Sequence, residues 1–123
     1  MIVTASACGS TPSDPDMLGG SEVYATCAAC HGKSGTGGVG PGLMGVRETF
    51  PDCETHMQWI RLGSEGWKAE VGPTYGTREA AIDQVMPAFE TLDELALRRI
   101  AMYERVRFGG GDIESERVAC GIG

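Results

Sequence analysis

Hydrophobic residues follow their clearest pattern in the last third of the chain, where they recur at the spacing of one face of an α-helix. The positions are Leu92, Leu95, Ala96, Ile100, Tyr103 and Val106. The preceding segment Thr91-Leu92-Asp93-Glu94 fits a capping box, in which Thr91 caps the helix and Glu94 bonds back to its start. We therefore predict a helix that begins after Thr91 and ends at the three glycines 109–111.

Two more helices are expected earlier in the chain. The first spans about residues 17–29, and Gly20, Tyr24, Cys27 and His31 recur on it at helical spacing. The second begins at a capping Asp52 and stops at Gly63. No segment alternates between apolar and polar residues as a strand would, so the pattern predicts an all-α fold.

The segments between the helices are rich in turn-forming residues. Residues 32–42 hold six glycines and a proline, which indicates a loop. Residues 64–85 show a weak pattern, and we expect mostly loop there, with a short helix near residues 78–85. The resulting organisation is a flexible leader at 1–16, one helical domain at 17–108 and a C-terminal tail at 109–123.

Length and charge narrow the class of protein. A chain of 123 residues suits one domain, and its net charge of −7 argues against nucleic acid and anionic membranes as partners. No apolar run approaches the roughly 18 residues of a membrane helix. Residues 5–9 look like the end of a signal peptide, so Cys8 is read either as a lipid-anchor cysteine or as part of a plain tail.

The most informative motif is Cys27-Ala28-Ala29-Cys30-His31, the C-x-x-C-H pattern of covalent haem attachment. The two cysteines would bond the porphyrin, and His31 would bind the iron. A thioredoxin-type reading requires alternating strands and helices, which the pattern lacks. A zinc module remains as an alternative, because Cys53 and His56 could complete a Cys₃His site with Cys27 and Cys30.

A haem electron carrier usually has methionine or histidine as a second axial ligand. Met86 is the favoured candidate of the six methionines, because it lies outside the predicted helices, 55 residues beyond His31, and is followed by Pro87. Pro87 would keep the segment extended. The alternatives are that Met86 is a surface residue, or that the only other histidine, His56, binds the iron; we expect His56 instead on a polar helix face.

Together these segments make the chain resemble a class I c-type cytochrome over residues 17–108. The matching pieces are Gly20-x-x-x-Tyr24, the C-x-x-C-H motif with Gly32, Gly40-Pro41-Gly42-Leu43, Met86-Pro87 and a last helix bearing Tyr103. The resemblance implies the cytochrome c fold, with three main helices and long loops around one covalent haem c.

The resemblance also implies roles for single residues. Cys27 and Cys30 would form thioethers, while His31 and Met86 would hold the iron. Pro41 would offer its carbonyl to the His31 ring, and Leu43 would pack on the haem face. Gly20 would let the first helix cross the last closely, with Tyr24 packing near Tyr103.

By the same resemblance, the protein is a one-electron carrier and not an enzyme. It would work outside the cytoplasm, in the periplasm or on the outer face of the cytoplasmic membrane, and exchange electrons with a reductase or an oxidase in a respiratory-type chain. A haem enzyme with an open or labile sixth position, peroxidase-like, is the alternative. Trp59 and Trp67 are candidates for bonding a haem propionate.

Two cysteines depart from the family pattern. Cys53 and Cys120 have no part in haem attachment, and spare cysteines tend to pair in an oxidising compartment. We expect a disulfide between them, which would tie the C-terminal tail to the second helix.

Overall fold

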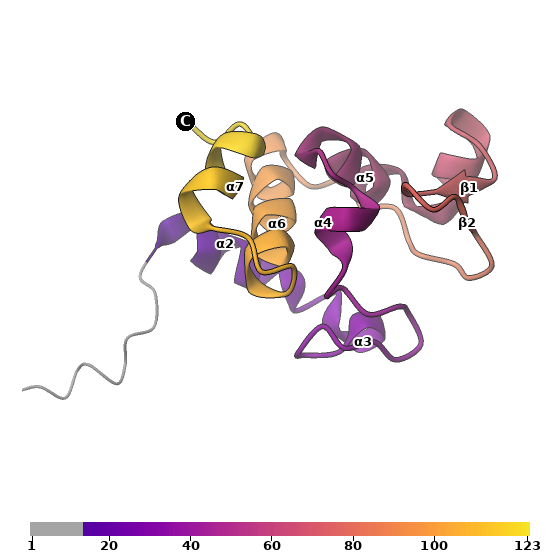
Figure 1. The fold of residues 1–123 in the computed structure, drawn as a ribbon, viewed down its shortest axis with the longest axis horizontal. Helices are drawn as coiled ribbons and strands as arrows, with labels where there is room; N and C mark the ends of the chain where they lie inside the picture. Colours follow the sequence, from indigo (N-terminus) through magenta and orange to yellow (C-terminus); the bar gives the residue numbers. More distant parts are fainter. Residues whose placement is uncertain (1–13) are drawn as a thin grey trace, which may run out of the picture.

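The computed structural model describes residues 14–123, and within them it is mostly helical (Figure 1). The elements in chain order are α2 (Pro15–Tyr24), α3 (Ala28–His31), α4 (Val46–Thr49), α5 (Cys53–Glu70), β1 (Thr74–Tyr75), β2 (Ala80–Ala81), α6 (Glu94–Arg107) and α7 (Ile113–Ala119). The all-α prediction is confirmed. Cys8 lies outside the described residues.

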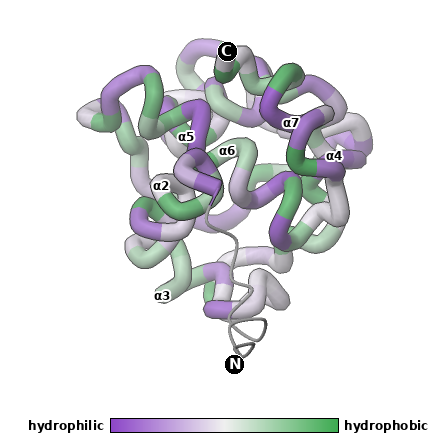
Figure 2. The backbone as a smooth tube through the Cα atoms, turned by 90° about the vertical axis from the view of Figure 1, so that its left-hand side faces the viewer, coloured by the Kyte–Doolittle hydropathy of each residue, from purple (hydrophilic) through white to green (hydrophobic). Residues whose placement is uncertain are grey.

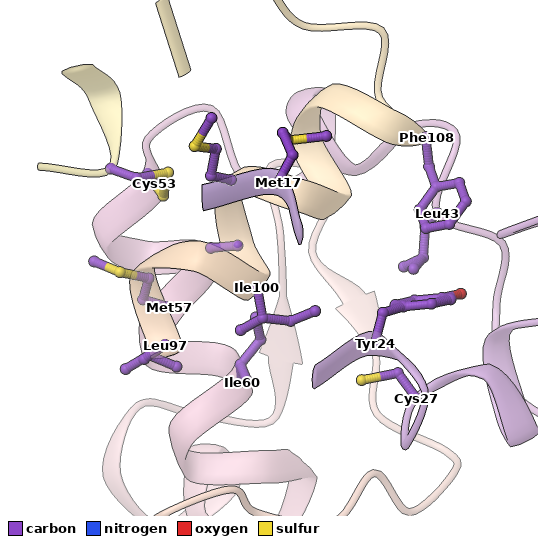
Figure 3. Close-up of a cluster of buried hydrophobic side chains, with 13 residues drawn as sticks. Met17, Tyr24, Cys27, Leu43, Cys53, Met57, Ile60, Leu97, Ile100 and Phe108 are labelled. Atoms are coloured by element: carbon purple, nitrogen blue, oxygen red, sulfur yellow. A yellow bond between two sulfur atoms is a disulfide. The ribbon is translucent and has the colours of Figure 1, made fainter. Parts of the chain in front are cut away.

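Helix α6 is the centre of the fold, and α2, α5 and α7 pack against it (Figure 1). The hydropathy of the chain changes repeatedly along these helices, as expected where each helix buries only one face (Figure 2). The main hydrophobic core lies between them, and Figure 3 shows it with α2 and α6 residues side by side. Its fully buried members on α6 are Ile100, Ala101 and Met102.

Helices α2 and α6 cross very closely at Gly20. A Cβ atom at Gly20 would collide with the Arg99 carbonyl oxygen and with Cβ of Tyr103. One turn further on, the rings of Tyr24 and Tyr103 are 5.7 Å apart, and the Tyr24 hydroxyl donates to the Gly32 carbonyl at 2.6 Å. The close crossing and the tyrosine contact that the resemblance implied are both present.

The first helix is shorter than predicted. It ends at Tyr24, and a separate short helix, α3, begins at Ala28. The amides of Ala25, Thr26 and Cys27 each bond the carbonyl three residues back, not four, which tightens the chain between the two helices. Most of the cysteine motif therefore lies in a short helix of its own, separate from α2.

Helix α5 begins as predicted, with the Asp52 carboxylate accepting from the Thr55 amide at 2.9 Å. The predicted end at Gly63 is wrong, because the helix continues to Glu70 after a break. Gly63 has φ 68° and ψ −179°, which only interrupts the helix. The buried Trp67 explains the continuation, since it anchors the second half of α5 in a smaller core cluster with Val46 and Phe50.

The short helix predicted near residues 78–85 is absent, and an antiparallel hairpin takes its place. Strand β1 pairs with β2 in the register Thr74 to Ala81 and Tyr75 to Ala80. Gly76, with φ 80°, makes the turn possible. The paired segments are two residues long, too short for sequence alternation to reveal.

The start of the last helix also differs from the prediction. Asp93, not Thr91, is the N-cap, and its carboxylate accepts from the Ala96 amide at 2.8 Å. Both residues are good caps by type, and the chain uses the later one. The helix ends at Arg107, and Phe108 separates it from the three glycines predicted to end it.

The C-terminal tail is held against α5. Cys53 and Cys120 form a disulfide, both cysteines are buried, and the chain between them carries α7. Arg117 of α7 also forms ion pairs with Asp14 and Asp16 at the start of α2. None of the helices in residues 14–123 is both long enough and apolar enough to cross a bilayer.

Replacing Gly20 by alanine should destabilise the fold by about 3 kcal/mol, because the new methyl group meets backbone that cannot move aside. Thermal or denaturant unfolding measures the effect. Gly19→Ala is the matched control: its Cβ would meet only the flexible Arg99 side chain, so stability should hold or rise slightly. Equal losses in the two variants would contradict the close crossing.

Replacing Cys53 by serine should lower the melting temperature under oxidising conditions only. The disulfide closes a loop with a sequence separation of 67 residues, and the chain-entropy model assigns such a closure about 4 kcal/mol. With a reductant present, the variant and the parent should melt nearly together. A loss of the same size in both conditions would show that Cys53 acts through packing alone.

Candidate functional site

A cavity of about 500 Å³ lies between the cysteine motif, the first half of α5 and the loop that precedes α6. Its wall contains all six residues singled out from the sequence: Cys27, Cys30, His31, Pro41, Leu43 and Met86. The lining is mainly apolar, which suits a large flat apolar group better than a small polar substrate.

His31 is held in one orientation by the loop that follows the motif. Its Nδ1 lies 2.7 Å from the Pro41 carbonyl oxygen, which can only accept, so Nδ1 carries the hydrogen. Nε2 then keeps its lone pair and is suited to bind a metal. Gly40 lets the loop lie against the ring, since a Cβ there would be 3.2 Å from the ring carbon Cε1.

Cys27 and Cys30 are the free cysteines of residues 14–123, and both line the cavity. Burial raises the pKa of the Cys27 thiol to about 11, and the negative charge of Glu104 adds to the rise. The Cys27 thiol is therefore protonated at neutral pH. Figure 3 shows Cys27 next to Tyr24 at one end of the core.

The zinc alternative does not fit this arrangement. Cys53 is joined to Cys120, so it has no thiolate to offer a metal. Residues 14–123 also contain no group of three or more histidine, cysteine or acidic side chains that could hold a metal ion. Cys27 and Cys30 thus face the cavity without the Cys53 thiolate that a Cys₃His site would need.

Met86 is tied to the break in α5 by paired hydrogen bonds. The Ser64 amide donates to the Met86 carbonyl at 3.0 Å, and the Met86 amide donates to the Ser64 hydroxyl at 2.9 Å. Gly63 permits this contact, because a Cβ there would lie 2.6 Å from the same carbonyl oxygen. The kink in α5 therefore positions Met86 in the cavity wall.

Gly63 and Ser64 are positioning residues that the sequence reasoning missed. The available signal is a glycine inside a run of helical periodicity, which by itself predicts the end of a helix. The partner of that glycine lies more than twenty residues away, so only the tertiary structure identifies its role.

The two tryptophans have different surroundings. The Trp67 indole N–H donates to the Thr74 carbonyl of β1 at 2.9 Å, so it holds α5 against the hairpin. Trp67 is not among the described residues that line the cavity. Trp59 does line the cavity, and its ring stacks on Tyr75 with centroids 4.6 Å apart. Of the two candidates for a propionate bond, only Trp59 is at the site.

His56 is not on a polar face, as the sequence suggested, but is 1% exposed and lines the cavity. Its Nε2 lies 2.9 Å from a Glu104 carboxylate oxygen, and its Nδ1 lies 3.4 Å from a guanidinium nitrogen of Arg105. Both ring nitrogens are engaged by other side chains, so His56 is not poised to bind a metal. Glu104 and Arg105 are buried and were also missed, because the helical pattern does not reveal partners on another helix.

A helical fold whose cavity gathers a C-x-x-C-H motif and a methionine is that of a haem-binding electron-transfer protein. The family model described as cytochrome c matches residues 18–103, well over half of the chain, and the chain belongs to the cytochrome c family. The family implies a haem c with iron. Comparison with curated proteins and with solved structures found no match.

Proposed function

We propose that this protein carries one covalently bound haem c and transfers single electrons between redox proteins. The observation that carries the proposal is that Cys27, Cys30, His31 and Met86 line the same cavity, although Met86 is 55 residues from His31 in the chain. Cys27 and Cys30 would form the thioethers. His31 and Met86 would be the axial ligands.

Each residue of the site has a distinct part in this function. The bound haem supplies the Fe(III)/Fe(II) couple. Pro41 keeps the His31 hydrogen on Nδ1, so that Nε2 is the atom offered to the metal. Ser64 holds the backbone of Met86, and a thioether ligand raises the reduction potential. If His31 and Met86 both bind the iron, no iron position is left for a substrate, which suits electron transfer better than catalysis.

The setting of this function follows from the covalent attachment and the disulfide. Covalent haem and a disulfide both suit an oxidising compartment outside the cytoplasm. The net charge of −7 favours basic faces on the reductase or oxidase that would be its partner. We therefore propose that the protein works in a respiratory-type chain, in the periplasm or on the outer face of the cytoplasmic membrane. A lipid anchor at Cys8 is a separate proposal, tested by labelling with a fatty acid.

The spectrum of the purified protein tests the proposed function. We expect haem that stays with the denatured chain, a reversible one-electron couple, and the weak near-infrared band of methionine–iron ligation in the oxidised form. A ferric spectrum without that band would favour a haem enzyme with an open sixth position. Protein that binds zinc and no haem would refute the proposal.

Replacing Met86 by alanine should convert the iron to a high-spin or ligand-exchanged form, because the sixth ligand is removed. The reduction potential should fall if another protein group binds in its place. Met44→Ala is the control, since Met44 is 53% exposed and its loss should leave the spectrum unchanged. An unchanged low-spin spectrum in Met86→Ala would mean that another residue is the ligand.

A further inference from the structure

A buried carboxylate lies in the wall of the haem cavity. Glu104 on α6 is 5% exposed and His56 on α5 is 1% exposed, and both line the cavity. Burying an ionised carboxylate is costly unless partners compensate. The rest of the cavity wall is mainly apolar, so a carboxylate in this position is little screened by polar neighbours.

The hydrogen bonds determine where the charge of the pair resides. A guanidinium can only donate, so Nδ1 of His56 accepts from Arg105 and the ring hydrogen is on Nε2. Nε2 then donates to Glu104. This leaves the imidazole neutral, and the carboxylate keeps its negative charge.

The cations that balance this charge lie behind His56, away from the cavity. Arg105 pairs with Glu116 of α7 at 2.6 Å and donates to the Phe50 carbonyl at 2.6 Å. Arg47 pairs with Glu116 as well, at 3.1 Å. None of Arg47, Arg105 and Glu116 is among the described residues that line the cavity. The carboxylate of Glu104 is therefore the one charged group of this network that lines the cavity.

The charge of Glu104 also acts on the pKa of neighbouring groups. Glu104 contributes to the raised pKa of Cys27, after burial, and to that of Tyr24, which rises to about 12 mainly by burial. Cys27 is the first haem-attaching residue. The other acidic residue in the cavity wall, Asp83, is exposed and screened by water.

We propose that Glu104 is a residue that sets the reduction potential of the haem, with His56 as its positioning residue. This rests on the proposed function. A negative charge held beside the cavity stabilises Fe(III) relative to Fe(II), so it lowers the potential that Met86 raises. Reduction adds one electron from the redox partner to the iron, and Glu104 makes and breaks no bond in that step.

The test is the midpoint potential of the haem-loaded Glu104→Gln variant. The glutamine oxygen can still accept from His56, so the change removes charge and little else. A unit charge at about 10 Å in protein should alter the equilibrium constant for reduction about tenfold, an upward shift of about 59 mV for one electron. No upward shift in a folded variant that carries haem would overturn the proposal.

Two matched controls separate position from charge. Asp83→Asn removes an exposed carboxylate from the same wall, and Glu116→Gln removes a buried one from behind Arg105. Both should shift the potential much less than Glu104→Gln, and equal shifts would overturn the proposal. If Glu104→Gln does not fold, Glu104→Met, of similar length and apolar, takes its place in the same comparison. A parent protein without a haem couple would refute the proposed function instead, so the two failures are distinct.

Discussion

The close crossing of α2 and α6 at Gly20 is the contact on which the site depends. It brings the end of α2 against α6, so that Tyr24 packs on Tyr103 and bonds the Gly32 carbonyl. The cysteine motif lies between Tyr24, which packs on the last helix, and Gly32, which is hydrogen-bonded to Tyr24. A side chain at Gly20 would separate the helices and move the motif with them.

A second close backbone approach, between α5 and the loop that carries Met86, also depends on a glycine. Gly63 interrupts α5 where the backbone of Met86 approaches it. Ser64 then forms two hydrogen bonds with Met86: its amide donates to the Met86 carbonyl, and its hydroxyl accepts from the Met86 amide. The methionine is therefore positioned by the kink of a helix, although it belongs to a loop. A helix without the break would leave the loop unsupported.

Polar groups connect the cavity to the C-terminal helix. Glu104, His56, Arg105 and Glu116 form a buried chain from the cavity wall to α7, and the disulfide of Cys120 holds α7 in place. Such a chain is stable only when each charge has a partner, because desolvation of an unpaired charge is costly. The tail after residue 108 is thus linked by hydrogen bonds to the cavity wall, although the family match ends at residue 103.

The sequence by itself determined the helical class, the haem motif at Cys27–His31 and the candidate ligand Met86. These depend on local spacing and on side-chain chemistry, which the linear chain displays. Tertiary structure alone decided that α5 continues past Gly63, that Asp93 caps α6 in place of Thr91, and that a hairpin follows α5. It also decided that His56 is buried against Glu104 and not on a polar face. The physical reason is that each of these outcomes depends on a partner distant in the chain or on a choice between equally good local signals, and only packing selects among them.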